Sequence, residues 1–164
     1  MDEIKKVEYD TINEIAAKHG FGIDLTLKDF YLSAILYLIK DVQGIYFKGG
    51  TALQKIFLNY SRMSEDIDFT LTKDVKEVIK EINKILEESK LFTRITKDKD
   101  VGGFTRLVVY YKGFSNEDES VFIDLNQRAH LLMKPENHRI NHFYKDNIPE
   151  FSFTTLAKEE MIAE

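Results

Sequence analysis

Apolar side chains recur every three to four residues in several segments, which is the spacing of one face of an α-helix. The pattern is clearest where Val75, Val78, Ile82 and Leu86 share a face and polar residues fill the positions between them. Other segments are bounded by glycines or begin at a residue suited to a helix N-cap, such as Thr26. The expected helices are Ile4–Lys18, Thr26–Lys40, one beginning at Thr51, Val75–Leu86, and one that begins near Thr155 and still runs at Glu164.

Two segments, Asp66–Leu71 and Val121–Asn126, instead alternate aliphatic and polar positions. Side chains of a β-strand alternate between its two faces, so each segment buries an aliphatic set and presents carboxylates on the other side. The expected strands are Ile45–Phe47, Asp66–Leu71, Phe92–Thr96, Phe104–Tyr111, Val121–Asn126 and Phe151–Thr154. This order of elements predicts an α+β domain, with a mixed β-sheet and helices packed mainly on one face.

Composition excludes several classes of protein. The 164 residues fit one domain, and the absence of cysteine excludes thiolate zinc sites, iron–sulfur clusters, cysteine nucleophiles and disulfide scaffolds. The start, Met1-Asp2-Glu3, lacks the basic segment and apolar core of a secretory signal. The longest apolar stretch, Phe30–Ile39, is far shorter than the ~20 residues that span a bilayer. We therefore expect a cytoplasmic protein with no membrane partner.

Three carboxylates are the main candidates for chemistry. Asp66 and Asp68 are two residues apart on one expected strand, so both project from one face, ~7 Å apart along the chain. Asp124 projects from the equivalent face of another strand. Carboxylates held this close repel one another, and a divalent cation such as Mg²⁺ or Mn²⁺ relieves that cost. The alternative is that these polar residues simply lie on a wet face of the sheet.

A glycine pair lies where the strand 45–47 ends and the next helix begins. Gly49 and Gly50 allow the backbone to turn tightly, and the first turn of a helix offers free N–H groups to an anion. Thr51 adds a hydroxyl, and Lys48 and Lys55 are near in sequence. This predicts a phosphate site, although a plain strand-to-helix turn would use the same residues. The spacing is not that of a P-loop or of a dinucleotide-binding fingerprint.

Charge is unevenly distributed along the chain. The formal net charge is −5, which argues against non-specific coating of nucleic acid. The segment Leu125–Lys145, however, holds four basic residues against the single acidic residue Glu136, and three of the four histidines. It is either a solvated basic loop or a patch that binds the phosphates of RNA. The basic residues and histidines are Arg128, His130, Lys134, His138, Arg139, His142 and Lys145.

The order of these motifs resembles a known family. The runs Phe47-Lys48-Gly49-Gly50-Thr51-Ala52-Leu53 and Arg62-Met63-Ser64-Glu65-Asp66-Ile67-Asp68-Phe69 are similar to the AbiEii/AbiGii toxin family of nucleotidyltransferases, a branch of the DNA polymerase β-like superfamily. Phe122-Ile123-Asp124-Leu125 is similar to the strand that carries the family's third carboxylate. Glu159–Glu164 resembles the opening of the family's next helix. The resemblance implies a polymerase β-like fold.

The resemblance also implies roles for the residues. Asp66 and Asp68 would ligate two Mg²⁺ ions, with Asp124 completing the site, and the segment Gly49–Thr51 would cradle the β- and γ-phosphates of a nucleoside triphosphate. The reaction would transfer a nucleoside monophosphate to an acceptor hydroxyl, on tRNA or another cellular target, and a cognate antitoxin would be a partner. Gln54 departs from the pattern, because relatives often carry arginine there.

The domain organisation follows from the same comparison. We expect N-terminal helices over 1–40, a catalytic core over 41–126, and a basic segment with the start of a further helix over 127–164. In the family that helix continues with a functional lysine, and a later segment supplies another acid, so the family's C-terminal helical domain would be truncated here. The alternative function is a catalytically inactive module with the same fold that binds a nucleotide or a partner.

Overall fold

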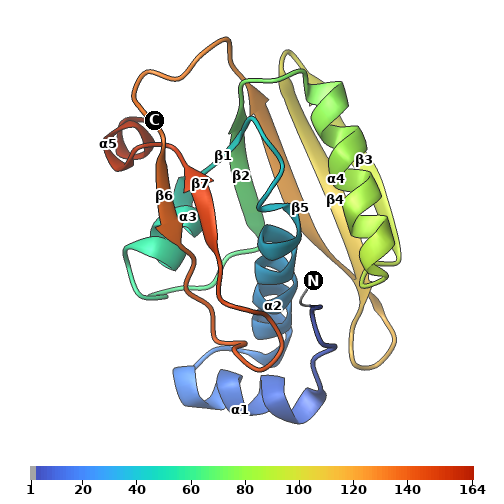
Figure 1. Cartoon of the computed structure of the whole chain (residues 1–164). Coiled ribbons are helices and arrows are strands. Elements are labelled where there is room, and N and C mark those ends of the chain that lie inside the picture. The colour runs from blue at the N-terminus through green and yellow to red at the C-terminus, as the bar shows by residue number, and fades with distance from the viewer. Residues whose placement is uncertain (1–2) are drawn as a thin grey trace.

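A computed structural model describes residues 3–164, and within them the chain forms five helices and seven strands (Figure 1). Met1 and Asp2, part of the argument against a secretory signal, lie outside the described residues. The helices are α1 (Tyr9–His19), α2 (Ile23–Ile39), α3 (Gly49–Ile56), α4 (Val75–Ser89) and α5 (Lys158–Ala163). The strands are β1 (Ile45–Lys48), β2 (Asp66–Leu71), β3 (Arg94–Val101), β4 (Phe104–Lys112), β5 (Asp118–Gln127), β6 (Glu136–Arg139) and β7 (Ser152–Thr155).

All seven strands join one sheet in the order β3-β4-β5-β2-β1-β7-β6. The pairs β2·β5 and β1·β7 are parallel and the other neighbours are antiparallel, so the sheet is mixed. The expected α+β class with a mixed sheet is therefore confirmed. Parallel pairing of β2 with β5 brings together two strands that are about fifty residues apart in the sequence, with α4 and the β3–β4 hairpin between them.

The core lies against one face of this sheet. The apolar side chains of β2, namely Ile67, Phe69 and Leu71, are fully buried, as the alternation predicts. The same is true of the apolar side chains of β5 that face the core. α2 and α4 lie together on one side of the sheet (Figure 1) and contribute their apolar residues to the same core cluster. α2 is buried around most of its circumference because α1 and residues of the C-terminal segment also pack on it. The opposite faces of β2 and β5 carry mainly polar side chains, together with Phe122 of β5.

Several boundaries differ from the expectation. The first helix begins at Tyr9, not Ile4, because the preceding residues pair instead with the C-terminal segment, where the Lys5 N–H donates to the Asn147 carbonyl (2.9 Å). The second helix begins at Ile23, and Thr26 lies inside its first turn with its hydroxyl donating to the Gly22 carbonyl (2.8 Å). The third begins at Gly49, two residues before the expected start.

The segment expected to be a basic loop contains an additional strand. β6 pairs with β7 at the edge of the sheet, and its residues are polar, so hydrophobic alternation could not reveal it. Among the described residues, no helix is both long enough and apolar enough to cross a membrane.

Candidate active site

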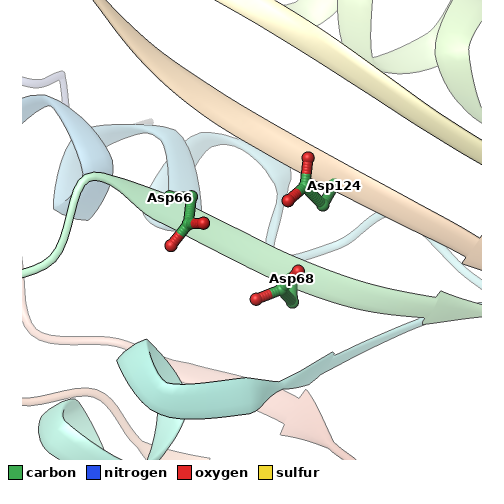
Figure 2. A group of neighbouring side chains, drawn as sticks. All are labelled: Asp66, Asp68 and Asp124. Carbon is green, nitrogen blue, oxygen red and sulfur yellow. The ribbon is translucent and has the colours of Figure 1, made fainter. Parts of the chain in front are cut away.

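The three predicted carboxylates converge on the polar face of the sheet. Asp66 and Asp68 project from β2 and Asp124 projects from β5 beside them (Figure 2), because the parallel register places Asp68 opposite Asp124. One oxygen of each of the three carboxylates lies within 4.8 Å of the other two. Asp124 is buried and the two β2 aspartates are partly buried. Oxygen ligands at this spacing can share a divalent cation.

Asp66 and Asp68 have raised pKa values and so hold their protons more tightly than free side chains do. Burial, followed by the charges of Asp66 and Asp124, raises the pKa of Asp68 from 3.8 to about 6. Burial and the charge of Asp124 also raise the pKa of Asp66, although nearby Arg106 opposes that shift. The site is therefore electrostatically costly when all three groups are ionised, and a bound dication would remove that cost.

Arg106 is a charged member of this site that the sequence analysis did not identify. It lies on β4 directly across from Asp124 and binds it through both oxygens, with Nε 2.7 Å from Oδ1 and Nη2 2.9 Å from Oδ2. The bond to Asp124 raises the pKa of Arg106. Alternation along β4 carries the signal that could have found it, because Thr105 and Leu107 are buried and Arg106 must face the other side.

Backbone conformation and a close contact beside the carboxylates favour glycine at position 49, and Gly50 also has a close neighbour. Gly49 has φ +85°, and a Cβ atom there would lie 2.8 Å from Oδ2 of Asp68. A Cβ atom at Gly50 would lie 2.9 Å from Nη2 of Arg62. The start of α3 therefore sits directly against one carboxylate and one guanidinium. The free N–H groups of its first turn lie next to the acidic residues, as a site for a metal-bound phosphate requires.

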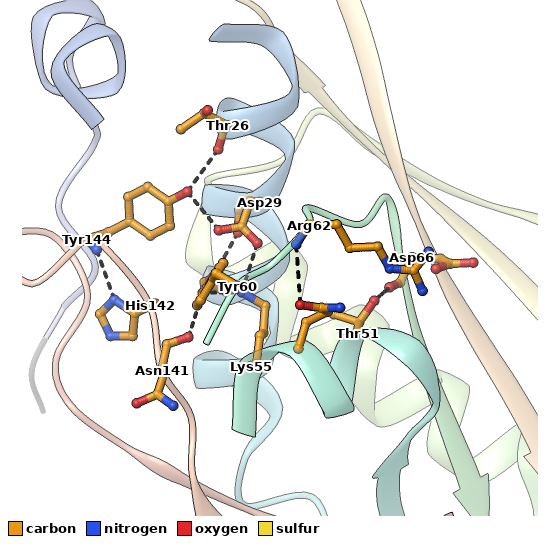
Figure 3. Close-up of polar contacts among 12 residues, drawn as sticks. Thr26, Asp29, Thr51, Lys55, Tyr60, Arg62, Asp66, Asn141, His142 and Tyr144 are labelled. Carbon is orange, nitrogen blue, oxygen red and sulfur yellow. Dashed lines mark hydrogen bonds and ion pairs between the residues drawn. The ribbon is translucent and has the colours of Figure 1, made fainter. Parts of the chain in front are cut away.

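Thr51 and Lys48, both predicted to contact phosphate, make other contacts here. Thr51 is buried, and its hydroxyl donates to the backbone carbonyl of Asp66 at 2.6 Å, which ties α3 to the start of β2 (Figure 3). Lys48 Nζ donates to Glu164 Oε1 at 2.8 Å and, through its charge, lowers the pKa of Asp68 against the dominant upward effects. Thr51 thus positions Asp66, and Lys48 stays beside the site with its ammonium group held by a carboxylate.

Lys55 is not brought to the site, which corrects the expectation that it binds phosphate. Its side chain is 1% exposed, and Nζ donates to Asp29 Oδ1 (2.9 Å), Ser33 Oγ (2.9 Å) and Tyr60 OH (2.6 Å). Figure 3 shows this buried cluster between α2 and α3, with Tyr144 donating to the second Asp29 oxygen at 2.8 Å. Because an α-helix has 3.6 residues per turn, Lys55 lies on a different side of α3 from Gly50, which faces Arg62, and points into the core.

An open cleft of about 510 Å³ adjoins the carboxylates. Its walls are the first turn of α3, residues 62–65 and the first residue of β2, together with Arg106 and Phe122. Gln54 holds the loop at this wall, because its side-chain oxygen accepts from Ser61 Oγ (2.9 Å) and from the Arg62 N–H (3.3 Å). Two arginines, the helix start and the two acidic residues Glu65 and Asp66 thus line the same space, which suits a triphosphate bound with a cation.

Much of the positive charge of the segment 125–145 is paired. Arg128 binds Glu160 (3.1 Å) and Glu164 (2.9 Å) of the C-terminal helix region. Arg139 forms an ion pair with Glu150, and the His142 ring is buried. Burial lowers the pKa of His142 below its usual value. These contacts favour a structural role for Arg128 and His142, whereas Lys134 and Lys145 form no ion pair within the described part of the chain.

Comparisons with known proteins agree with this geometry. Residues 31–164 match the model of the family described as "Nucleotidyl transferase AbiEii toxin, Type IV TA system". Among solved structures, MenT4, a nucleotidyltransferase toxin from Mycobacterium tuberculosis, is 21% identical with a TM-score of 0.68 and covers 96% of this chain. JHP933 from Helicobacter pylori is 19% identical with a TM-score of 0.61 and covers 85% of it. At these identities the likeness shows the fold.

The matched structures are longer than this chain. The alignment covers 57% of MenT4 and 55% of JHP933, so the chain spans just over half of the length of each. No curated protein matches the chain in sequence.

Proposed function

Since this chain belongs to the AbiEii family of nucleotidyl transferase toxins, we propose that it transfers a nucleoside monophosphate from a nucleoside triphosphate to an acceptor hydroxyl. A new bond forms between the acceptor oxygen and the α-phosphorus, and the bond from that phosphorus to the β-phosphate bridge breaks, which releases pyrophosphate. The observation that carries the proposal is the convergence of Asp66, Asp68 and Asp124 beside the glycine turn that begins α3.

The donor set fits Mg²⁺ or Mn²⁺. It consists of carboxylate oxygens, which both ions prefer, and burial followed by the charges of Asp66 and Asp124 raises the pKa of Asp68, a cost that a bound dication would offset. Asp66, Asp68 and Asp124 would hold the metal. When bound, it supplies charge neutralisation at the attacking and leaving oxygens of phosphoryl transfer.

The remaining work of the site is to position the two substrates. Gly50 and Arg62 line the cleft, and the backbone N–H groups at the start of α3 and the guanidinium of Arg62 would bind the phosphates of the triphosphate. Thr51 keeps Asp66 in place by holding its carbonyl. Phosphoryl transfer depends mainly on such positioning and on charge neutralisation, so these contacts account for most of what the protein contributes.

The acceptor and the partner are part of the proposal. The acceptor is an RNA hydroxyl, with tRNA as the first candidate, or a hydroxyl on another cellular target. A cognate antitoxin protein is the proposed partner, since the family is that of toxin–antitoxin systems. We propose the cytoplasm as the site of the reaction, because triphosphates and tRNA are both available there.

Labelling of RNA tests the proposal. The purified chain is incubated with Mg²⁺, total RNA and each α-³²P-labelled triphosphate in turn, and the wild type is expected to label RNA with one of them. Asp68→Asn should abolish the label, and Asp118→Asn, an exposed aspartate of β5 paired with Lys112, should retain it. Equal labelling by wild type and Asp68→Asn contradicts the proposal. Magnesium-dependent triphosphate binding without pyrophosphate release would identify the binding module instead.

A further inference from the structure

Four charged side chains form a row across four neighbouring strands at the site. In the sheet order β4-β5-β2-β1, Arg106 lies opposite Asp124, Asp124 opposite Asp68, and Asp68 opposite Lys48. Side chains at paired positions point to the same face of a sheet, so the row runs positive, negative, negative, positive. Each carboxylate of the row therefore has a cation as one of its two cross-strand neighbours.

The two cations of the row are engaged differently. Lys48 forms its ion pair with Glu164, 2.8 Å away, and Asp68 has no ion pair of its own within residues 3–164. Arg106 instead takes both oxygens of Asp124, at 2.7 Å and 2.9 Å, in the bidentate geometry that makes such pairs strong. The Asp124 side chain is only 6% exposed, so water weakens this bond little. Of the three acids, Asp124 is the one whose charge is already satisfied.

Arg106 also borders the cleft in which the proposal above places the triphosphate. Its guanidinium lies 4.6 Å from the centre of the Phe122 ring, and both residues line that cleft. The side chain is 23% exposed, so it has solvent-accessible space on the cleft side. If Arg106 releases Asp124, its guanidinium therefore lies next to the position proposed for the phosphates of the triphosphate.

We propose that Arg106 controls the third carboxylate: it holds Asp124 in the metal-free protein and exchanges Asp124 for phosphate oxygens when the metal and the triphosphate bind. This inference rests on the proposed function and makes Arg106 a positioning residue for the metal site. A guanidinium bound to both ligand oxygens competes with a dication for the same lone pairs and repels it. Binding of the triphosphate would relieve that competition, so that the nucleotide and the metal favour each other's binding.

Mn²⁺ binding to the nucleotide-free chain tests the first half of this proposal. The electron paramagnetic resonance signal of free Mn²⁺ measures its affinity for the wild type, Arg106→Gln, Arg106→Lys and Arg62→Gln. Arg106→Gln should bind Mn²⁺ about tenfold more tightly than the wild type. Arg106→Lys keeps the charge but not the bidentate contact, and should fall between the two. Arg62→Gln removes a charge from the same cleft without freeing Asp124, and should change the affinity by less than about threefold.

Binding of a non-hydrolysable triphosphate tests the second half. Arg106→Gln should weaken its binding about tenfold, and Arg106→Lys should restore part of the affinity. If Arg106→Gln binds Mn²⁺ as the wild type does, or if Arg62→Gln gains as much affinity, then Arg106 does not control Asp124. If Arg106→Gln binds the triphosphate analogue as the wild type does, then Arg106 does not move from Asp124 to the phosphates. Asp68→Asn separates these results from a failure of the proposed function, because wild-type Mn²⁺ binding by Asp68→Asn would mean that the three aspartates are not the metal site.

Discussion

Replacement of Lys55 by methionine should destabilise the protein. It should remove no contact from the proposed nucleotide site, because Lys55 does not reach that site. Methionine is similar to lysine in length but removes the buried ammonium group, which donates to Asp29, Ser33 and Tyr60. The Asp29 carboxylate would then remain 2% exposed, with the Tyr144 hydroxyl as its side-chain donor. Burial lowers the pKa of Lys55, and the charge of Asp29 and its hydrogen bond to the ammonium group oppose that shift.

The structure sets the expected magnitude. Removal of one partner from a buried ion pair costs about 3–5 kcal/mol, because the other charge stays in the protein without compensation. The lower end of that range corresponds to a fall in Tm of about 6–12 °C for a chain of this size. The double variant Asp29→Asn/Lys55→Met carries neither charge, so it should be more stable than the sum of the single effects indicates, by about 2 kcal/mol or more.

Equilibrium unfolding in urea, followed by circular dichroism at neutral pH, measures these free energies. Lys84→Met is the matched control, because Lys84 is an exposed lysine on α4 and its replacement should change stability by less than about 0.5 kcal/mol. A loss of less than about 1 kcal/mol in Lys55→Met would refute the reasoning. Weaker triphosphate binding with unchanged stability would instead restore Lys55 as the phosphate contact that the sequence suggested.

Three further predictions concern the carboxylate site. The pKa of Asp68, raised from 3.8 to about 6, means that the metal-free folded state binds the proton more tightly than the unfolded chain, so wild-type stability should fall as the pH rises from about 4 to about 6. Asp68→Asn should show a smaller fall, because only the raised pKa of Asp66 remains, and should be more stable at pH 7.5 by about 1–2 kcal/mol in urea unfolding, a value reduced for partial exposure. Equal pH profiles would contradict the assignment. Thr51→Val should cost about 1–3 kcal/mol by the same assay, since it leaves the Asp66 carbonyl without its 2.6 Å donor, and Thr51→Ser should retain most of the stability. Gly49→Ala should weaken Mn²⁺ binding about tenfold in calorimetry, because its Cβ would lie 2.8 Å from Asp68 Oδ2. Gly20→Ala is the control, since Gly20 has a similar φ of +75° but open space around it. This variant should lose some stability and keep its metal affinity.

The position of the acids could be predicted from the sequence because it depends on local periodicity. Once Asp66–Leu71 and Val121–Asn126 are strands with one buried face, their carboxylates must lie on the other face. The glycine turn was predictable for a similar reason, since Gly49 and Gly50 directly follow β1. That these groups meet at one point requires β2 to pair with β5, which no local pattern states.

The charges around the acids were harder to assign, because a cation reaches whichever partner the packing provides. Lys48, Lys55 and Arg128 look alike in the sequence as possible phosphate contacts. In the structure, Lys55 meets Asp29 of α2, while Lys48 and Arg128 both bind Glu164. These partners are separated by 26 to 116 residues along the chain, so no spacing rule could identify them.

The amino-acid sequence by itself determined which strands carry carboxylates, which face they occupy, and where a glycine turn opens a helix beside them. The reason is that these properties follow from backbone geometry repeated over two or three residues. Only the tertiary structure decided that Arg106 forms a bidentate ion pair with Asp124 and that Lys55 is buried with Asp29. Those pairings follow from strand register and helix packing, where long-range burial selects among charges that are locally equivalent.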